Sequence, residues 1–332
     1  MPSVPQRVCD RIDEVLARLE RAYDVEVAFA TARGSHAWGG AGPDSDYDVG
    51  FVFVESDRHR YAHLGGPRES IDGLPTGVGS DAEGEHLDAM DEQQTGEPTA
   101  ASVDLEVQGW DVTTLARLVV DSNVSALDLL RSPIRYRTTY DPAPLAAFLE
   151  RSYNPIDLYH DWRGIARTNY RTYLSDHLVY DGEVVSILER EADGYRVETD
   201  DGTAWIDPDD ERYRETATQR TVKRNLTVCR AAMSARYLKA TGERDGHELP
   251  RRDFEAFLEE QAPAVFDADR IELAWDLLER KRRGEADAVV GVRVGREFAH
   301  PPRRIDPDVH AREGPDRDRV NAFVDAILEA CA

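Results

Sequence analysis

The chain has 332 residues, enough for two domains, and 41% of them are hydrophobic, so a sizeable core is available. It carries 65 acidic residues against 41 lysines and arginines, a formal net charge of -24. Such a field excludes nucleic-acid binding through overall charge, and allows it only on a face where basic residues gather. The acids are spread along the whole chain and lysine is scarce, a pattern that favours a halophilic protein.

Cysteine usage and hydropathy indicate the compartment. The three cysteines are far apart and odd in number, so no disulfide framework is predicted. No apolar run approaches the length of a membrane span, and the start of the chain lacks the pattern of a signal peptide. We therefore expect a cytoplasmic protein without a membrane partner, and the sequence leaves its oligomeric state open.

Residues 1–135 predict a small mixed αβ domain. Apolar spacing indicates a helix over 6–22, and apolar runs indicate strands over 25–30, 49–54 and 102–108. Residues 65–100 are rich in Gly, Asp, Glu and Pro without periodicity, which predicts an exposed acidic insertion. Two short helices are expected between Trp110 and Pro133.

Residues 136–332 predict a mostly helical domain. The expected helices cover 142–152, 155–178, 216–241, 251–261, 267–283 and 316–330. Residues 183–206 alternate in polarity and contain two Asp-Gly turns, which predicts a small antiparallel β insertion. The two halves together predict an α+β fold with a small mixed sheet.

The stretch GSHAWGGAGPDSDYDV, residues 34–49, concentrates the chemistry. Three aspartates, Asp44, Asp46 and Asp48, precede a buried strand. Because strand side chains alternate, Asp46 and Asp48 point the same way. Adjacent carboxylates repel each other unless a cation lies between them, and Mg²⁺ commonly takes one or two carboxylates plus substrate phosphates. The sequence therefore predicts a site for Mg²⁺ or Mn²⁺.

The Gly34-Ser35 pair and a third acid would complete a phosphoryl-transfer site. Gly34 allows the backbone to approach a phosphate closely, and the Ser35 hydroxyl and the following N–H groups can donate to it. A two-metal site also needs a further carboxylate that helps to deprotonate the attacking hydroxyl. Asp104 and Glu106 share one face of the third strand, and either could serve.

The Gly-Ser pair and the paired aspartates at this offset resemble the signature of the DNA polymerase β-like nucleotidyltransferase superfamily. With QGWDVTTLARLV, LLRSPIRY, YHDWRGIARTNY and KRNLTVCRAAMSARYL, the chain resembles the RlaP/YcgL group of predicted nucleotidyltransferases, which gene context associates with RNA repair.

The resemblance implies a role for each matching position. Asp46 and Asp48 would be the metal ligands, and Gly34 and Ser35 would hold the nucleoside triphosphate. The third acid of the family lies four residues before the tryptophan of GWD, which is Glu106 here, with Asp104 as the alternative. The chain departs from the family pattern at two positions, where His36 replaces a frequent arginine and Gly50 replaces a common basic residue.

Further candidate nucleotide contacts lie outside the central pair. His36 and Ser45 flank the motif, while Lys223 and Arg230 lie seven residues apart on one face of a long helix. Arg167 and Asn169 could also line the cleft, although each such residue is common as a solvated or ion-paired side chain. His160 is expected to be structural, and Trp38 and Trp110 to belong to the core.

Rival interpretations remain for the acidic cluster. The spacing of Asp44, Asp46, Asp48 and Glu55 echoes an EF-hand calcium loop, but Val49 stands where glycine is required and a β run follows. Plain surface acidity is the other alternative, and it applies to Glu106 as the solvent face of an edge strand.

These observations predict a nucleotidyltransferase that moves NMP from an NTP, with ATP favoured, to an acceptor hydroxyl and releases pyrophosphate. An RNA end is the acceptor that the resemblance implies. One alternative is transfer of AMP to a protein or small molecule, as in antitoxin-type or aminoglycoside-modifying relatives. The other is a catalytically silent nucleotide-binding protein.

Overall fold

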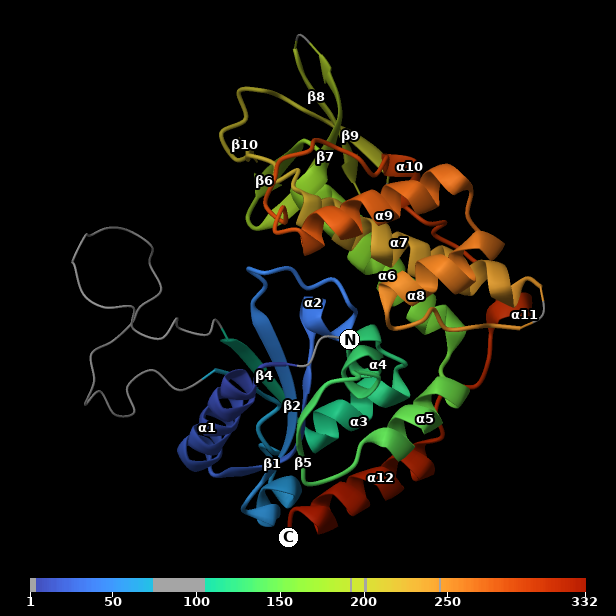
Figure 1. The fold of residues 1–332 in the computed structure, drawn as a ribbon. Coiled ribbons are helices and arrows are strands. Elements are labelled where there is room, and N and C mark those ends of the chain that lie inside the picture. Colours follow the sequence, from blue (N-terminus) through green and yellow to red (C-terminus); the bar gives the residue numbers. More distant parts are fainter. Residues whose placement is uncertain (1–3, 74–104, 192, 200–201, 245) are drawn as a thin grey trace.

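The computed structural model describes residues 4–73, 105–191, 193–199, 202–244 and 246–332 (Figure 1). Its first half is built on a sheet with the strand order β3-β4-β2-β1-β5. The strands are β1 (Val25–Ala32), β2 (Tyr47–Glu55), β3 (Ser70–Asp72), β4 (Leu105–Asp111) and β5 (Arg135–Thr138). β2 runs parallel to β4 and the other pairs are antiparallel. The first residues of β2 and β4 therefore lie at the same edge of the sheet.

Helices cover both faces of this sheet. On one face α1 (Gln6–Tyr23) buries Ile12 and Leu16 against apolar side chains of β1 and β2. On the other face lie α3 (Val112–Val120) and α4 (Val124–Leu130), which begin at the capping side chains of Asp111 and Asn123. The short helices α2 (Gly34–Ala37) and η1 (Arg58–Ala62) follow β1 and β2 along the chain. Burial on both faces explains why β1 and β2 read as continuous apolar runs.

The second half is mainly helical. α6 (Pro155–Asn169) packs along α7 (Val222–Gly242), and α7 and α9 (Ala268–Arg282) share a second core with Leu226, Phe257 and Leu277. In Figure 1 these helices lie beyond the edge of the first sheet where α2 is found. The helices are α5 (Ala143–Ser152), α6 (Pro155–Asn169), α7 (Val222–Gly242), α8 (Phe254–Ala256), α9 (Ala268–Arg282), α10 (Arg296–Ala299), α11 (Pro307–His310) and α12 (Arg317–Ala330), with tighter or wider turns at η2 (Tyr170–Leu174), η3 (Phe257–Gln261) and η4 (Ala262–Ala264).

A second sheet interrupts the helices between α6 and α7. It is antiparallel, with the order β10-β6-β7-β8-β9. Its strands are β6 (His177–Tyr180), β7 (Glu183–Glu191), β8 (Gly194–Thr199), β9 (Gly202–Ile206) and β10 (Arg214–Glu215). The sheet is therefore wider than the 183–206 insertion expected from sequence.

Two predicted helices are shorter than expected because of this sheet. The helix expected over 155–178 ends at Asn169, and after the π-helical turn η2 the chain enters β6, which pairs with β7 across a turn at Asp181 and Gly182. The helix expected from 216 begins at Val222, where the Thr221 side chain caps it. Short apolar segments fit a strand as well as a helix, so periodicity alone misplaced both ends.

The first half also differs from expectation at one strand and one insertion. β4 continues to Asp111 because Trp110 pairs with Ser70 of β3, which lies inside the segment expected to be an insertion. The remainder of that segment, 74–100, and the start of the third predicted strand lie outside the described residues.

The last helix returns to the first half of the molecule. α12 packs against α3, and Val320 and Ile327 belong to the same core as Leu115 and Val119 (Figure 1). Arg58 also donates a hydrogen bond of 2.6 Å to the Cys331 carbonyl. The division of the chain at residue 135 remains a prediction, and α12 lies against the unit that this division assigns to the first domain.

The α+β fold class predicted from sequence is confirmed by the mixed sheet and its surrounding helices. Among the described helices, none combines the length and apolar character that crossing a membrane requires.

Candidate active site

Three carboxylates converge at the edge where β2 and β4 begin. Asp48 lies opposite Glu106 in the parallel register, and Asp46 precedes β2. One carboxylate oxygen from each of the three residues lies within 4.8 Å of the others. We call these residues the acid triad. The prediction that Asp46 and Asp48 share a direction, and that Glu106 joins them, agrees with this geometry.

The carboxylates of the acid triad repel one another. The pKa of Asp48 is raised to about 6, first by burial and then by the charges of Asp46 and Glu106, while Lys223 and Arg33 act to lower it. Like charges held this close disfavour full ionisation. A divalent cation between the carboxylates would remove that penalty.

Gly34 is required by the position of Asp48. Its φ is +54°, a conformation that residues with a side chain rarely adopt. A Cβ at this position would lie 1.6 Å from Asp48 Oδ2. The glycine of the motif therefore lets the turn after β1 pass directly beside the acid triad.

The residues after Gly34 line the same turn. Ser35 is buried, and its hydroxyl has no hydrogen-bond partner within the described part of the chain. The His36 ring stacks on Tyr47 at 4.3 Å between centroids, and burial lowers the pKa of His36. Ser45 accepts a hydrogen bond from the Gly42 N–H, so its side chain holds the loop that leads to Asp46.

Arg33 is a site residue that sequence reasoning missed. Its NH1 donates to Gln108 Oε1 at 2.5 Å, and its guanidinium lies 5.2 Å from the centre of the Trp110 ring. A Cβ at Gly50 would lie 2.4 Å from Arg33 Cδ. The small residue at 50, a departure from the family pattern, thus leaves the space through which the Arg33 side chain passes. A basic residue directly before Gly34 was the available signal.

A pocket of about 220 Å³ opens at this place. It is lined by Arg33, Gly34, Asp48, Val49, Glu106 and Gln108. Carboxylates and one guanidinium share its wall, which suits a phosphate together with a metal ion.

Two lysines of the helical half bring positive charge near the acid triad. The chain has three lysines, at 223, 239 and 281. Lys223, predicted as a nucleotide contact, is close enough for its charge to lower the pKa of Asp48. Lys281, which sequence reasoning missed, is buried and donates to the Gly40 carbonyl at 3.0 Å and to Ser45 Oγ at 3.2 Å. Scarcity of lysine was the signal that could have found it.

Lys281 belongs to a clasp between α9 and the loop before Asp46. Arg282 donates to the Gly39 carbonyl at 2.8 Å, next to the Lys281 bond. A Cβ at Gly42 would lie 2.5 Å from the Lys281 carbonyl, so the two segments are in close contact. Burial lowers the pKa of Lys281, as does the charge of Lys223, while Asp46 and Asp48 act to raise it.

Other predicted residues lie apart from the acid triad. Arg230 is placed against Asp128, at 3.9 Å, and over the Trp38 ring, at 5.0 Å from its centre. Asp44 is exposed beside Gly284 and is not part of the triad. Asp104 lies outside the described residues. The strand that begins at Tyr47 excludes the EF-hand alternative, because that loop must lead into a helix.

The two tryptophans and His160 differ in how exposed they are. Trp38 is buried, whereas Trp110 is half-buried under Arg33. His160 is exposed on α6, with its ring edge-on to Tyr159. The interpretation of His160 as a non-catalytic residue stays a prediction.

The residues present fit a divalent metal. Hard cations such as Mg²⁺ and Mn²⁺ prefer oxygen ligands, and the acid triad offers three carboxylates. The unpartnered Ser35 hydroxyl, on the turn that passes Asp48, is an additional donor for an oxygen-rich ligand. The magnesium or manganese prediction therefore agrees with the chemistry of the donor set.

Comparisons with known proteins agree with the chemistry of this site. A family model described as RlaP, RNA repair pathway DNA polymerase beta family, matches residues 8–325. The chain is also similar to the uncharacterized protein YcgL of Bacillus subtilis (strain 168), with 28% identity over 165 residues, 49% of this chain and 53% of that protein. The chain thus spans about half the length of this curated relative.

Proposed function

The chain belongs to the RlaP family, the RNA repair pathway DNA polymerase beta family, and on this premise we propose that it is a metal-dependent nucleotidyltransferase. It transfers NMP from a nucleoside triphosphate, with ATP favoured, to an acceptor hydroxyl, and pyrophosphate leaves. The favoured acceptor is an RNA end, because the family description names RNA repair.

The observation that carries this proposal is the acid triad next to Gly34. Asp46, Asp48 and Glu106 offer three oxygens within 4.8 Å of one another. The turn at Gly34 passes so close to Asp48 that no side chain fits between them. A phosphate seated on this turn would therefore lie beside the carboxylates.

Each residue has a role that follows from its chemistry. Asp46, Asp48 and Glu106 would hold the metal, and Gly34 and Ser35 would bind the phosphates. A divalent ion at this place supplies positive charge to the attacked phosphate and lowers the pKa of the attacking hydroxyl. Glu106, the most exposed of the three acids, would receive the proton of that hydroxyl. Arg33 and Lys223 bring positive charge to the departing pyrophosphate.

The test is transfer of label from α-labelled NTPs, each in turn, with Mg²⁺ or Mn²⁺ at high salt. Total cellular RNA and total protein serve as acceptors. The control is the double variant Asp46→Ala with Asp48→Ala, purified in the same way and checked by circular dichroism. We expect label on RNA that the double variant does not transfer.

Other outcomes separate the alternatives. Label on protein, absent with the double variant, would keep the chemistry and replace the acceptor. Nucleotide binding without transfer to RNA, protein or small acceptors would contradict the enzyme and favour a nucleotide-binding protein.

A further inference from the structure

A second polar pocket lies between α6, the second sheet and the segment after α10. Its volume is about 690 Å³. Arg163 and Arg167 come from α6, Glu198 from β8, and His300 and Arg303 from the segment that follows α10. None of its lining residues also lines the acid-triad pocket. We call it the arginine pocket.

The arginine pocket holds positive charge at Arg163 and Arg303 that the described residues offset only in part. Arg163 donates through Nε to the Pro301 carbonyl at 2.9 Å. Within the described residues, neither Arg163 nor Arg303 has a carboxylate oxygen within ion-pair distance. Burial lowers the pKa of Arg163, and the charges of Arg167 and Arg303 also lower it, while Tyr159 and Glu198 act to raise it. Neighbouring guanidiniums repel one another, so this arrangement costs free energy unless an anion binds.

The carboxylate in the pocket is already engaged. Glu198 pairs with Arg296 at 2.6 Å, and lies 3.9 Å from Arg167 NH2 and 3.9 Å from His300 Nε2. Burial acts to raise the pKa of Glu198, but its bond to Arg296 and the surrounding positive charges hold it below the usual value. Among the described lining residues Glu198 is the acid, and it lies within ion-pair distance of neither Arg163 nor Arg303, in a chain whose net charge is -24.

We propose that the arginine pocket binds a phosphate group, and that in the working enzyme this phosphate belongs to the backbone of the RNA acceptor. Guanidinium groups present parallel N–H donors that match the oxygens of a phosphate. A pocket of about 690 Å³ has room for a phosphate together with its flanking ribose. The RNA source rests on the proposed function, whereas the phosphate site rests on the geometry alone.

This site explains how so acidic a chain can hold a polyanion. The acid triad must bind a cation, and it repels a strand that approaches it without one. Backbone contacts position a nucleic acid without reading its sequence. A phosphate held on α6 and the second sheet would anchor the strand at a place apart from the acid triad.

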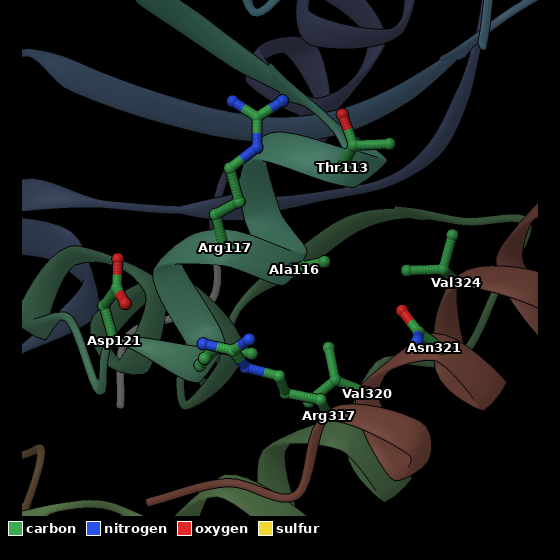
Figure 2. Close-up of a pocket in the computed structure, with 9 residues that line it drawn as sticks. Thr113, Ala116, Arg117, Asp121, Arg317, Val320, Asn321 and Val324 are labelled. Atoms are coloured by element: carbon green, nitrogen blue, oxygen red, sulfur yellow. The ribbon is translucent and has the colours of Figure 1, made fainter. Parts of the chain in front are cut away.

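The experiment is fluorescence anisotropy of a 5′-labelled single-stranded RNA with the full chain, over a series of salt concentrations. The variants are Arg303→Ala, which removes an exposed guanidinium, and Arg163→Gln, which removes the half-buried one. The matched control is Arg317→Ala, another exposed arginine, which lines a separate groove of about 500 Å³ between α3 and α12. Figure 2 shows Arg317 and Val320 of α12 facing Arg117 and Ala116 of α3 across that groove.

We expect each pocket variant to weaken RNA binding by at least about fivefold. The slope of log affinity against log salt should fall by about 0.7 for each phosphate that the variant no longer neutralises. Arg317→Ala should leave both quantities unchanged. Circular dichroism and thermal melting identify any variant that fails to fold. Arg303→Ala carries the lowest risk of misfolding, because Arg303 is at the surface.

Calorimetry with inorganic phosphate distinguishes the source of the ligand. If the pocket variants fail to bind inorganic phosphate but keep RNA, the phosphate site stands and RNA is not its source. If they bind RNA and inorganic phosphate as the unmodified chain does, the proposal is wrong.

The same titrations in the Asp46→Ala, Asp48→Ala background separate this proposal from the proposed function. The arginine pocket is intact in that background, so the arginine-dependent binding should persist without catalysis. An unmodified chain that binds RNA through these arginines but transfers no label in any assay would contradict the nucleotidyltransferase and leave the pocket standing.

Discussion

The acid triad and the arginine pocket carry opposite charges, but electrostatic repulsion between like charges acts in both. Each gathers like charges that the described surroundings offset only in part, at Asp46, Asp48 and Glu106 in one case and at Arg163 and Arg303 in the other. In both places the repulsion is a cost that a ligand of opposite charge removes. A local excess of one charge therefore indicates a ligand of the opposite charge, even where the net charge of the whole chain disfavours that ligand.

The two sites differ in how the chain builds them. Two adjacent strands in fixed register place the acid triad, with Asp48 opposite Glu106. The arginine pocket is assembled from a helix, a strand of the second sheet and an irregular segment, which supply Arg163, Glu198 and Arg303. We expect the acid triad to be the less tolerant of the two, and substitutions at each site test that order.

The largest effect should follow removal of one triad carboxylate. Asp48→Asn keeps the shape of the side chain and removes its charge, so metal-dependent transfer should fall by more than about 100-fold. Addition of Mn²⁺ should raise the melting temperature of the unmodified chain, because a ligand at 100 times its dissociation constant stabilises the folded state by about 2.7 kcal/mol. The variant should not show this rise. A metal-induced rise equal to that of the unmodified chain would remove Asp48 from the site.

The next effect concerns the turn beside the acid triad. Gly34→Ala should lower transfer by about 10-fold to 100-fold, because its Cβ would displace the Asp48 carboxylate and its φ of +54° strains any other residue. Gly164→Ala is the matched control, since nothing lies within 4 Å of a Cβ there and alanine favours the interior of α6. Kinetics on both variants check the pair. Equal activities would contradict the close packing at Gly34.

A tenfold effect is expected from the clasp on the loop before Asp46. Lys281→Met keeps most of the side-chain volume but removes the bonds to Gly40 and Ser45. Charged hydrogen bonds contribute about 1.5–3 kcal/mol, so transfer should fall about tenfold or more as the loop loosens. Lys239→Met, at the exposed pair with Glu243, is the control. Steady-state rates at saturating NTP measure the difference, and a rate unchanged in Lys281→Met would show that the clasp does not position Asp46.

The pair His247 and His310 sharpens the comparison, because these neighbouring rings avoid like-charge repulsion by staying neutral. His247 Nε2 and His310 Nδ1 lie 2.8 Å apart. Burial, Arg312 and His310 lower the pKa of His247 to about 4, and burial lowers that of His310, with Glu243 and Asp306 opposing and Lys239 assisting. The unfolded chain therefore binds more protons, so stability is complete above about pH 6.5 and is lost as pH falls towards about 4.

His247→Gln should reduce this acid sensitivity. The melting temperature of the unmodified chain should fall by a few degrees more than that of the variant between pH 6.5 and pH 4. Melts followed by circular dichroism across this range measure the difference, with His59→Gln at the exposed surface of η1 as the control. Identical pH profiles for the unmodified chain and His247→Gln would show that the pair does not carry the effect.

The smallest effect should come from the acid inside the arginine pocket. Glu198→Gln removes the negative charge that partly offsets the arginines, so phosphate affinity should rise by about twofold to fivefold. Calorimetry with inorganic phosphate measures it. A fall in affinity would mean that Glu198 organises the arginines more than it neutralises them.

Sequence reasoning reached the acid triad because its members lie in a motif with fixed spacing. Strand alternation aligned Asp46 and Asp48, and the resemblance to the family favoured Glu106 over Asp104. It missed Arg33 and Lys281, since their approach to the site depends on how a side chain crosses Gly50 and how α9 meets the loop before Asp46. No local pattern encodes such packing.

The same limit applies to the fold and to the second pocket. The α+β class followed from the order of apolar runs, but the end of α6 did not, because β6 forms only through pairing with β7. The arginine pocket was invisible because Arg163, Glu198 and Arg303 lie in separate segments. Arg167 was singled out by its motif, yet its neighbours could be named only from the structure.

The parallel pairing of β2 with β4 affects the order in which parts of the protein fold. Residues 48 and 106 are joined by a long stretch of chain, and closing such a loop precedes the contacts that reward it. In a refolding reaction the helices of the second half can form early, whereas the two strands that carry Asp48 and Glu106 meet late. Capacity to bind Mn²⁺ should therefore return after the far-ultraviolet signal, which makes the ion a reporter of completed assembly.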